Sequence, residues 1–177
     1  MTDAEPEPLL VFDNTCLSAF ASAHLMPVLK DLTLGYRVGA TEAVRDEFCA
    51  GPNNVADIAW VDLLPEQGMD ELVALAEYVQ ALGAGEHDLG EATVFASAQV
   101  RGAIAITDDA TATKIARRIK KVEVHGSLWL LIRAYRDGKV NEQRASEIVD
   151  ALRARGARYP CDGAELFSWA RSRNLLE

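Results

Sequence analysis

The sequence predicts an α/β fold: a three-layer α/β/α sandwich around a central, mostly parallel sheet, followed by a C-terminal helical extension. Two observations predict it. Strand-like and helix-like segments alternate along the first 126 residues, and the strand candidates are apolar almost throughout. Strands of a parallel sheet are covered by helices on both faces, so they read as continuous apolar runs. The 177 residues, 49% of them hydrophobic, suffice for one domain with a substantial core.

Apolar runs and stop signals define the elements in the first part of the chain. The run Leu9–Phe12 ends directly at Asp13, and apolar residues then resume at helical spacing, with Pro27 late in the segment. Thr41 is a suitable residue to open a helix, and Pro65 stops a strand. The expected elements are a strand at 9–13, a helix at 15–29, a strand at 36–41, a helix at 42–48 and a strand at 59–65.

The second part continues the alternation and then becomes helical. One helical stripe is formed by Leu72, Leu75, Ala76, Val79 and Leu82. The expected elements are helices at 70–82 and 91–101, a strand at 103–107, a helix at 110–121 and a strand at 122–126. Two helices joined at 137–141 and a short final segment should follow. The expected division is a flexible stub at 1–8, an α/β core at 9–126 and C-terminal helices at 127–177 packed on that core, as a single domain.

Composition excludes several classes of protein. No run approaches the roughly 18 apolar residues of a membrane span, and the N-terminus lacks the features of a signal peptide, so we expect a cytoplasmic protein. The net charge of −9 argues against a broad nucleic-acid-binding surface. Cys16, Cys49 and Cys161 lie far apart with no CxxC spacing, which favours free thiols over disulfides or a zinc site.

One basic segment contrasts with the net negative charge. The stretch Lys114–Lys121 holds five cations in eight residues. On a helix these side chains spread over several faces. They form either a solvated surface or a local patch that contacts phosphates.

Four segments each bring an acid to a strand end or to an inward helix face. Asp13 directly follows the first strand, and Asp108 and Asp109 directly follow a later one. In open parallel sheets, ligands bind beyond the carboxyl ends of the strands. Glu47 and Glu91 share helix faces with apolar residues three or four positions away, so both should point inward.

Each acid also has a plain structural explanation. Asp13 could begin a turn, and Asp109 could be a helix N-cap. Asp88 and Glu91 could form a capping pair, and Glu47 could be a surface residue out of phase with its helix. One shared site, however, explains all four positions at once.

Carboxylates that converge on one site repel one another unless a cation neutralises them. Oxygen ligands suit Mg²⁺ or Mn²⁺, whereas zinc prefers histidine or cysteine. His24, His87 and His125 occupy unrelated elements, so we expect them to be structural or exposed. The absence of GxSxG, Walker and GxGxxG motifs removes the usual support for serine hydrolases and nucleotide-binding folds.

The ordered set of motifs resembles the PIN-domain ribonucleases, which include the VapC-like toxins of type II toxin–antitoxin pairs. The match runs through "VFDNTCLSAF", "TEAVRDEF", "LGEATVFASA" and "AITDDATATKIA" and covers most of the chain from about Leu9 to the helices after Gly126. The resemblance implies a PIN-like fold and a Mg²⁺- or Mn²⁺-dependent endoribonuclease. Such a hydrolase cleaves RNA phosphodiester bonds with metal-activated water.

The resemblance also implies residue roles. Its catalytic and metal-binding acids correspond to Asp13, Glu47, Glu91 and the pair Asp108 and Asp109. Which of the two aspartates contacts the metal stays open, as does the choice between one and two metals. Thr15 and Thr107 match supporting hydroxyl positions, and Lys114 and Arg117 would help to hold the RNA.

Similar PIN toxins form dimers and are inhibited by a partner protein, so the resemblance implies an antitoxin and a homodimer as possible partners. The C-terminal tail adds an argument for a dimer, because its apolar groups include Trp129, Leu130 and Trp169. The alternative is that these side chains simply pack on the core.

Two other functions are compatible with parts of the pattern. Haloacid dehalogenase-like phosphatases also begin with a strand that ends in aspartate. They need a second aspartate two residues later, where this chain has Thr15. A non-catalytic PIN-like binding module would retain the fold and use the acids structurally, although all four acidic positions are filled.

Overall fold

The computed structural model describes residues 7–66, 68–83 and 88–177. Most of the expected stub at 1–8 and His87 lie outside these ranges. Of Asp88 only the backbone is described, so its capping role stays a prediction. Within them, five strands form one sheet in the order β3-β2-β1-β4-β5, and all four strand pairings are parallel. The strands are β1 (Leu9–Phe12), β2 (Arg37–Thr41), β3 (Asp62–Leu64), β4 (Ile104–Ile106) and β5 (Glu123–His125).

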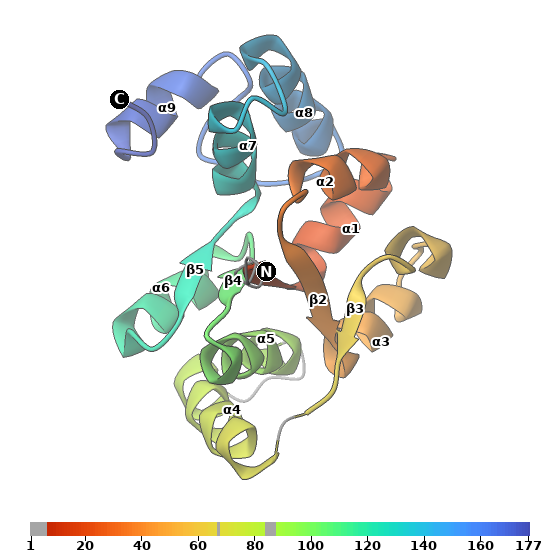
Figure 1. The fold of residues 1–177 in the computed structure, drawn as a ribbon, viewed down its shortest axis with the longest axis vertical. Helices are drawn as coiled ribbons and strands as arrows, with labels where there is room; N and C mark the ends of the chain where they lie inside the picture. Colours follow the sequence, from red (N-terminus) through yellow and green to blue (C-terminus); the bar gives the residue numbers. More distant parts are fainter. Residues whose placement is uncertain (1–6, 67, 84–87) are drawn as a thin grey trace, which may run out of the picture.

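Helices connect the strands and cover both faces of the sheet. In the core they are α1 (Asn14–Ser22), α2 (Met26–Leu32), α3 (Glu42–Ala50), the 3₁₀ helix η1 (Val55–Ile58), α4 (Gly68–Leu82), α5 (Asp88–Arg101) and α6 (Ala110–Ile119). The C-terminal extension contains α7 (Ser127–Arg136), α8 (Glu142–Ala154) and α9 (Leu166–Ser172). Figure 1 shows α4 and α5 on one side of the sheet and α1, α2 and α7 on the other. The predicted α/β sandwich with a parallel sheet is confirmed.

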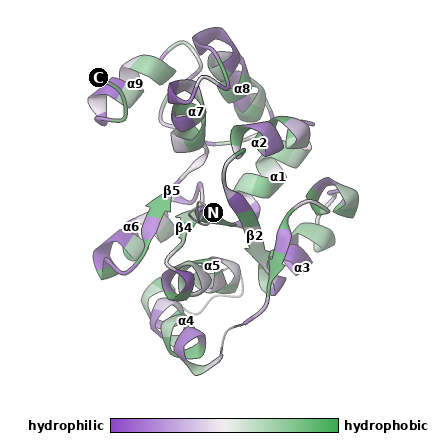
Figure 2. Cartoon of the chain, viewed as in Figure 1, coloured by the Kyte–Doolittle hydropathy of each residue, from purple (hydrophilic) through white to green (hydrophobic). Residues whose placement is uncertain are grey.

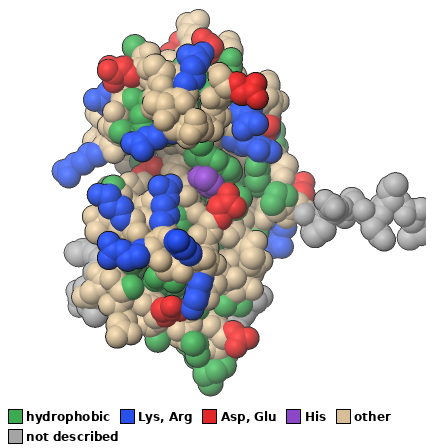
Figure 3. All heavy atoms as spheres, turned by 90° about the vertical axis from the view of Figure 1, so that its left-hand side faces the viewer, with side chains coloured by type: hydrophobic (Ala, Val, Ile, Leu, Met, Phe, Trp, Pro, Cys, Tyr) green, Lys and Arg blue, Asp and Glu red, His purple; other side chains and the backbone are tan. Residues whose placement is uncertain are grey.

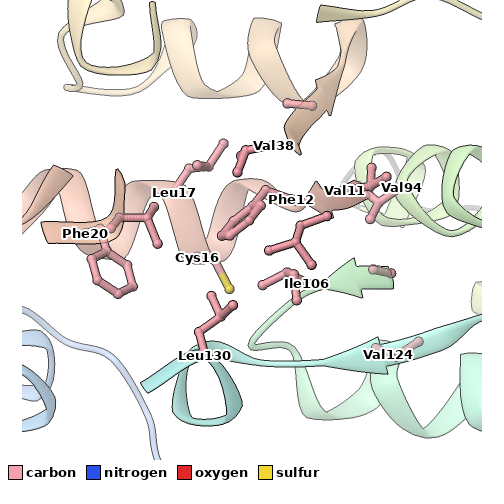
Figure 4. Packing of buried hydrophobic residues seen from close by; sticks show 14 of the residues in the cluster. Val11, Phe12, Cys16, Leu17, Phe20, Val38, Val94, Ile106, Val124 and Leu130 are labelled. Carbon is pink, nitrogen blue, oxygen red and sulfur yellow. The ribbon is translucent and has the colours of Figure 1, made fainter. Parts of the chain in front are cut away.

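The core lies on both faces of the central strand. Phe12 and the α1 side chains Cys16 and Phe20 have no solvent exposure, and they pack near Ile106 and Leu130 (Figure 4). On the opposite face, α5 contacts β1, β2 and β4. In Figure 2, hydrophobic residues dominate α1, whereas α6 carries long hydrophilic stretches. Helix α6 therefore covers the sheet with one face and presents the other to solvent.

Two predicted elements differ from the observed ones. The single helix expected at 15–29 is two helices, because His24 has a positive φ of 57° that interrupts the helical path. Pro27 then occupies the first turn of α2, where its missing N–H costs nothing. The strand expected at 59–65 is reduced to β3, because the chain before it forms η1 and a turn in which Trp60 donates to the Asp57 carbonyl at 2.9 Å.

The C-terminal extension packs on the core. Helix α7 contacts α2, and α8 contacts α1. The apolar tail residues that suggested a dimer lie largely inside this packing: Leu130 is buried, and Trp129 and Trp169 are partly buried against the core. These tail residues therefore give no support for a dimer. No helix in the described part of the chain is long and apolar enough to cross a membrane.

Candidate active site

Four of the predicted acids lie in one cleft at the carboxyl ends of β1 and β4. They reach it from four separate elements: the N-cap of α1, the middle of α3, the first turns of α5 and the N-cap of α6. The cleft has a volume of about 440 Å³. It is lined by Asp13, Thr15, Glu47, Leu82, Glu91, Asp109, Thr111, Ala112 and Ile115. The cleft therefore lies beyond the carboxyl ends of the strands, where ligands bind in open parallel sheets.

Asp13 is the most deeply placed of these acids, with 2% of its surface exposed. Its Oδ2 accepts hydrogen bonds from the Thr15 backbone N–H at 3.2 Å, the Thr15 hydroxyl at 2.5 Å and the Thr107 hydroxyl at 3.2 Å. Burial raises the pKa of Asp13 above its ordinary value, the hydrogen bonds from Thr15 oppose that shift, and the charge of Glu47 adds to it. The folded protein thus holds a carboxylate in a place that disfavours its charge.

The two threonines join Asp13 to the turn between β4 and α6. The Thr107 hydroxyl accepts from the Asp109 backbone N–H at 3.1 Å, and the Thr15 hydroxyl accepts from the Asp108 N–H at 3.4 Å. The first acid and the turn that carries the fourth acid are consequently connected through hydroxyl groups. The resemblance implies supporting hydroxyl groups at these two positions, and both hydroxyls donate to Asp13 in the structure.

Glu47 was expected to point inward, and the structure differs in part. Its side chain is exposed, because α3 buries Val44 and Phe48 and leaves Glu47 on the flank that borders the open cleft. Gly90 makes room for it: a Cβ at this glycine would lie 2.9 Å from Glu47 Oε2. Glu91, the next residue, is partly buried and lines the same cleft.

Asp108 and Asp109 point in different directions. Asp109 caps α6, because its Oδ1 accepts from the Ala112 N–H at 2.7 Å, and it also lines the cleft. Asp108 accepts instead from the Ser127 N–H at 2.7 Å, the Ser127 hydroxyl at 2.6 Å and the Tyr159 hydroxyl at 3.2 Å. It is not among the residues that line the cleft. The structure thus brings Asp109, and not Asp108, to the other acids.

The basic residues of α6 are exposed on the face shown in Figure 3, where lysine and arginine side chains gather. Lys114 and Arg118 follow the cleft residue Thr111 by three and seven positions, so they lie on the same side of α6. Arg117 faces elsewhere and donates to the Val124 carbonyl at 3.4 Å. Of the two predicted cations, Lys114 is therefore the closer to the cleft side of the helix.

The donor set fits a hard divalent cation in its chemistry. All four acids supply carboxylate oxygens, and no lysine, arginine or histidine of the described residues forms an ion pair with Asp13, Glu47 or Asp109. Within the same ranges, no three acidic, histidine or cysteine side chains stand close enough together to hold one ion. Glu47 is exposed, so it can change rotamer without disturbing the core.

Sequence reasoning missed three features of this region. Thr111 lines the cleft, Gly90 creates space for a carboxylate, and Tyr159 reaches back from the C-terminal extension to Asp108. Only the glycine left a signal in the sequence, as a residue without a side chain directly before a predicted site acid. The contact of Tyr159 spans 51 positions along the chain, and no local pattern indicates it.

Comparison with known proteins identifies the family of the chain. A family model described as a PIN domain matches residues 9–166, which is most of the chain. A comparison with curated proteins gives no match. The match covers all four cleft acids and leaves the phosphatase alternative without support. The chain therefore belongs to the PIN-domain family, whose members are usually nucleases that bind divalent metals.

Proposed function

We propose that this protein is a metal-dependent endoribonuclease that cleaves RNA phosphodiester bonds, and that it acts as a toxin of the VapC-like type. One observation carries the proposal. Four carboxylates from four elements line one cleft, and the deepest of them, Asp13, is buried without a cationic partner in the described part of the chain. An unpaired buried charge costs free energy, so a cation bound from solution would neutralise the carboxylate of Asp13.

The residues that would hold Mg²⁺ or Mn²⁺ are Asp13, Glu47, Glu91 and Asp109. When bound, the ion supplies an activated water and stabilises negative charge on the phosphate, so no histidine base is needed. The chain's own groups orient the acids: Thr15 and the residue opposite it, Thr107, hold Oδ2 of Asp13 by three hydrogen bonds. Asp108 is left out of this set because its carboxylate is engaged elsewhere.

The basic side of α6 provides a place for the RNA backbone. Thr111 and Ile115 line the cleft, and Lys114 and Arg118 continue the same side of the helix into solvent. Because the protein carries a net charge of −9, attraction of RNA must be local. We propose Lys114 and Arg118 as the principal phosphate contacts, with Arg117 on the far side of α6 in a lesser role.

An antitoxin and a homodimer are the partners that this function would have. The C-terminal tail no longer supports a dimer, but exposed apolar residues lie on α4, among them Met69, Leu72 and Val73. Light scattering of the isolated chain tests the homodimer: a strict monomer at high micromolar concentration would reject it.

RNA cleavage by the purified protein tests the enzymatic proposal. Cleavage should require Mg²⁺ or Mn²⁺, stop in chelator, and leave a 5′-phosphate and a 3′-hydroxyl. Asp13→Asn should abolish it while the fold persists. Asp62→Asn is the matched control, because Asp62 begins β3 at the other end of the sheet and should leave cleavage unchanged. A protein that neither cleaves RNA nor binds Mn²⁺ would be a non-catalytic binding module instead.

A further inference from the structure

The partly buried contacts of Asp108 form a network that the proposed reaction does not use. Both of its carboxylate oxygens accept from Ser127, through the backbone N–H at 2.7 Å and the hydroxyl at 2.6 Å, and Tyr159 donates to Oδ2 at 3.2 Å. Ser127 has no solvent exposure. The three donors come from the start of α7 and from the segment between α8 and α9. Asp108 thus connects the turn after β4 to the C-terminal extension.

Gly126 has no side chain, and this leaves room for the Asp108 carboxylate. A Cβ at Gly126 would lie 2.7 Å from Asp108 Oδ1 and 3.1 Å from the Thr107 carbonyl oxygen, so a larger residue there would push the turn away. Burial, together with the charge of Asp108, raises the pKa of Tyr159 well above its ordinary value. The Tyr159 hydroxyl therefore stays protonated and remains a hydrogen-bond donor to the carboxylate.

The turn at 107–109 is held from two opposite sides. On the cleft side, the N–H groups of Asp108 and Asp109 donate to the Thr15 and Thr107 hydroxyls, which in turn donate to Asp13. On the other side, the Asp108 carboxylate accepts from Ser127 and Tyr159. The Thr107 N–H also donates to the His125 carbonyl at 2.9 Å. Any displacement of this turn would therefore move Asp109 and loosen the hydroxyl support of Asp13 together.

We propose that Asp108 is a positioning residue: its network with Ser127 and Tyr159 places Asp109 and Thr107, which makes the C-terminal extension part of the active site. This inference rests on the proposed function, because it assumes that the cleft acids bind a cation. A half-buried carboxylate that accepts from three donors is held in one orientation, and groups that orient metal ligands set the affinity of the site.

Mn²⁺ affinity of the full-length chain tests the proposal. Tyr159→Phe removes one hydroxyl from Asp108 and should weaken Mn²⁺ binding about 10-fold, the usual scale for a group that orients a ligand. Tyr135→Phe is the matched control, since it removes a hydroxyl that donates to Glu142 at 3.2 Å on the surface of the same extension. It should leave Mn²⁺ binding unchanged.

The measurement separates positioning from stability when it is made well below the melting temperature of each variant, because the apparent dissociation constant equals the intrinsic one once nearly all molecules are folded. Asp108→Asn combined with Tyr159→Phe should cost less than the sum of the two single changes, since both act through one network. A Tyr159→Phe protein that melts earlier but binds Mn²⁺ as tightly as the wild type would overturn the inference and leave the proposed function intact. A wild type that binds no Mn²⁺ would instead overturn the proposed function, and this inference with it.

Discussion

Buried acids have different partners at the two ends of the sheet. At the amino ends of the strands, Arg101 pairs with Glu71 at 3.0 Å, and both side chains are only 8% exposed. Arg37 pairs with Asp62 at 3.2 Å nearby, around a cavity of about 750 Å³. At the carboxyl ends, Asp13 is equally buried, yet its described partners are hydroxyls and backbone N–H groups.

This difference separates an acid that is neutralised within the chain from an acid that the proposed function assigns to a cation. A buried carboxylate beside a guanidinium is neutralised within the chain, whereas hydroxyl groups orient a carboxylate without neutralising it. The same residue type is therefore structural at one end of the sheet and available to a cation at the other. Five predictions can break or sharpen this contrast.

The largest effect on stability should come from the buried ion pair. Arg101→Met should lower the free energy of unfolding by about 3 kcal/mol, because it leaves a buried glutamate without its guanidinium. The guanidinium also donates to the Ser97 hydroxyl at 2.7 Å and to the Pro65 carbonyl. Urea denaturation measures the loss. The double variant Arg101→Met, Glu71→Leu should recover much of it, and a single-variant loss below about 1 kcal/mol would contradict the pairing argument.

Positively charged side chains near the cleft should contribute to RNA binding, whereas those at the amino ends of the strands should not. Replacing Lys114 and Arg118 together by alanine should raise KM for RNA about 10-fold at low salt. It should also lower the salt dependence of binding by about 1.4 in log–log slope, for two lost contacts to a single strand. Arg37→Ala is the control at the amino ends of the strands. If Arg37→Ala raised KM as much as the double variant, the two ends of the sheet would not differ in RNA binding.

The buried acid at the carboxyl ends should destabilise the metal-free protein. Because the pKa of Asp13 is raised in the folded state, the folded protein binds protons more tightly than the unfolded one. Stability in chelator should therefore fall as pH rises from the ordinary value of 3.8 through the raised pKa, and then level off. Asp13→Asn should flatten this profile and stabilise the neutral-pH protein by roughly 1 kcal/mol, the scale of one unpaired buried group.

Calorimetry of Mn²⁺ binding independently checks that the pKa of Asp13 is raised. Mn²⁺ must displace the proton that the raised pKa retains, so below that pKa the binding heat should depend on the ionisation enthalpy of the buffer. Binding that is equally tight at pH 5 and pH 8, with no buffer dependence, would show that these acids do not share a site.

The smallest effect should come from the exposed ion pair. The side chains of Arg37 and Asp62 are 55% and 56% exposed, so water already screens their attraction. Arg37→Ala should change the free energy of unfolding by less than about 0.5 kcal/mol. Thermal unfolding at low and high salt measures it, and a loss as large as that of Arg101→Met would mean that burial does not decide the strength of these pairs.

Much of the fold follows from local patterns. The strand ending at Asp13, the helix opened by Thr41 and the strand before Thr107 all appear where apolar runs and caps indicate them. The boundary errors arise where backbone geometry overrides composition. His24 adopts a left-handed conformation in a segment whose apolar spacing alone reads as continuous helix.

The sequence by itself determined that acids would gather at the carboxyl ends of a parallel sheet, because strand ends and helix phase are local properties. Only the tertiary structure decided which of the adjacent aspartates enters the cleft. Asp109 faces the other acids, whereas Asp108 turns to Ser127 and Tyr159, which lie 19 and 51 positions away along the chain. Likewise, Glu71 is neutralised by Arg101, 30 positions later, whereas no cation of residues 7–66, 68–83 and 88–177 pairs with Asp13. Such partners are brought together by packing, and no pattern within a single element encodes them.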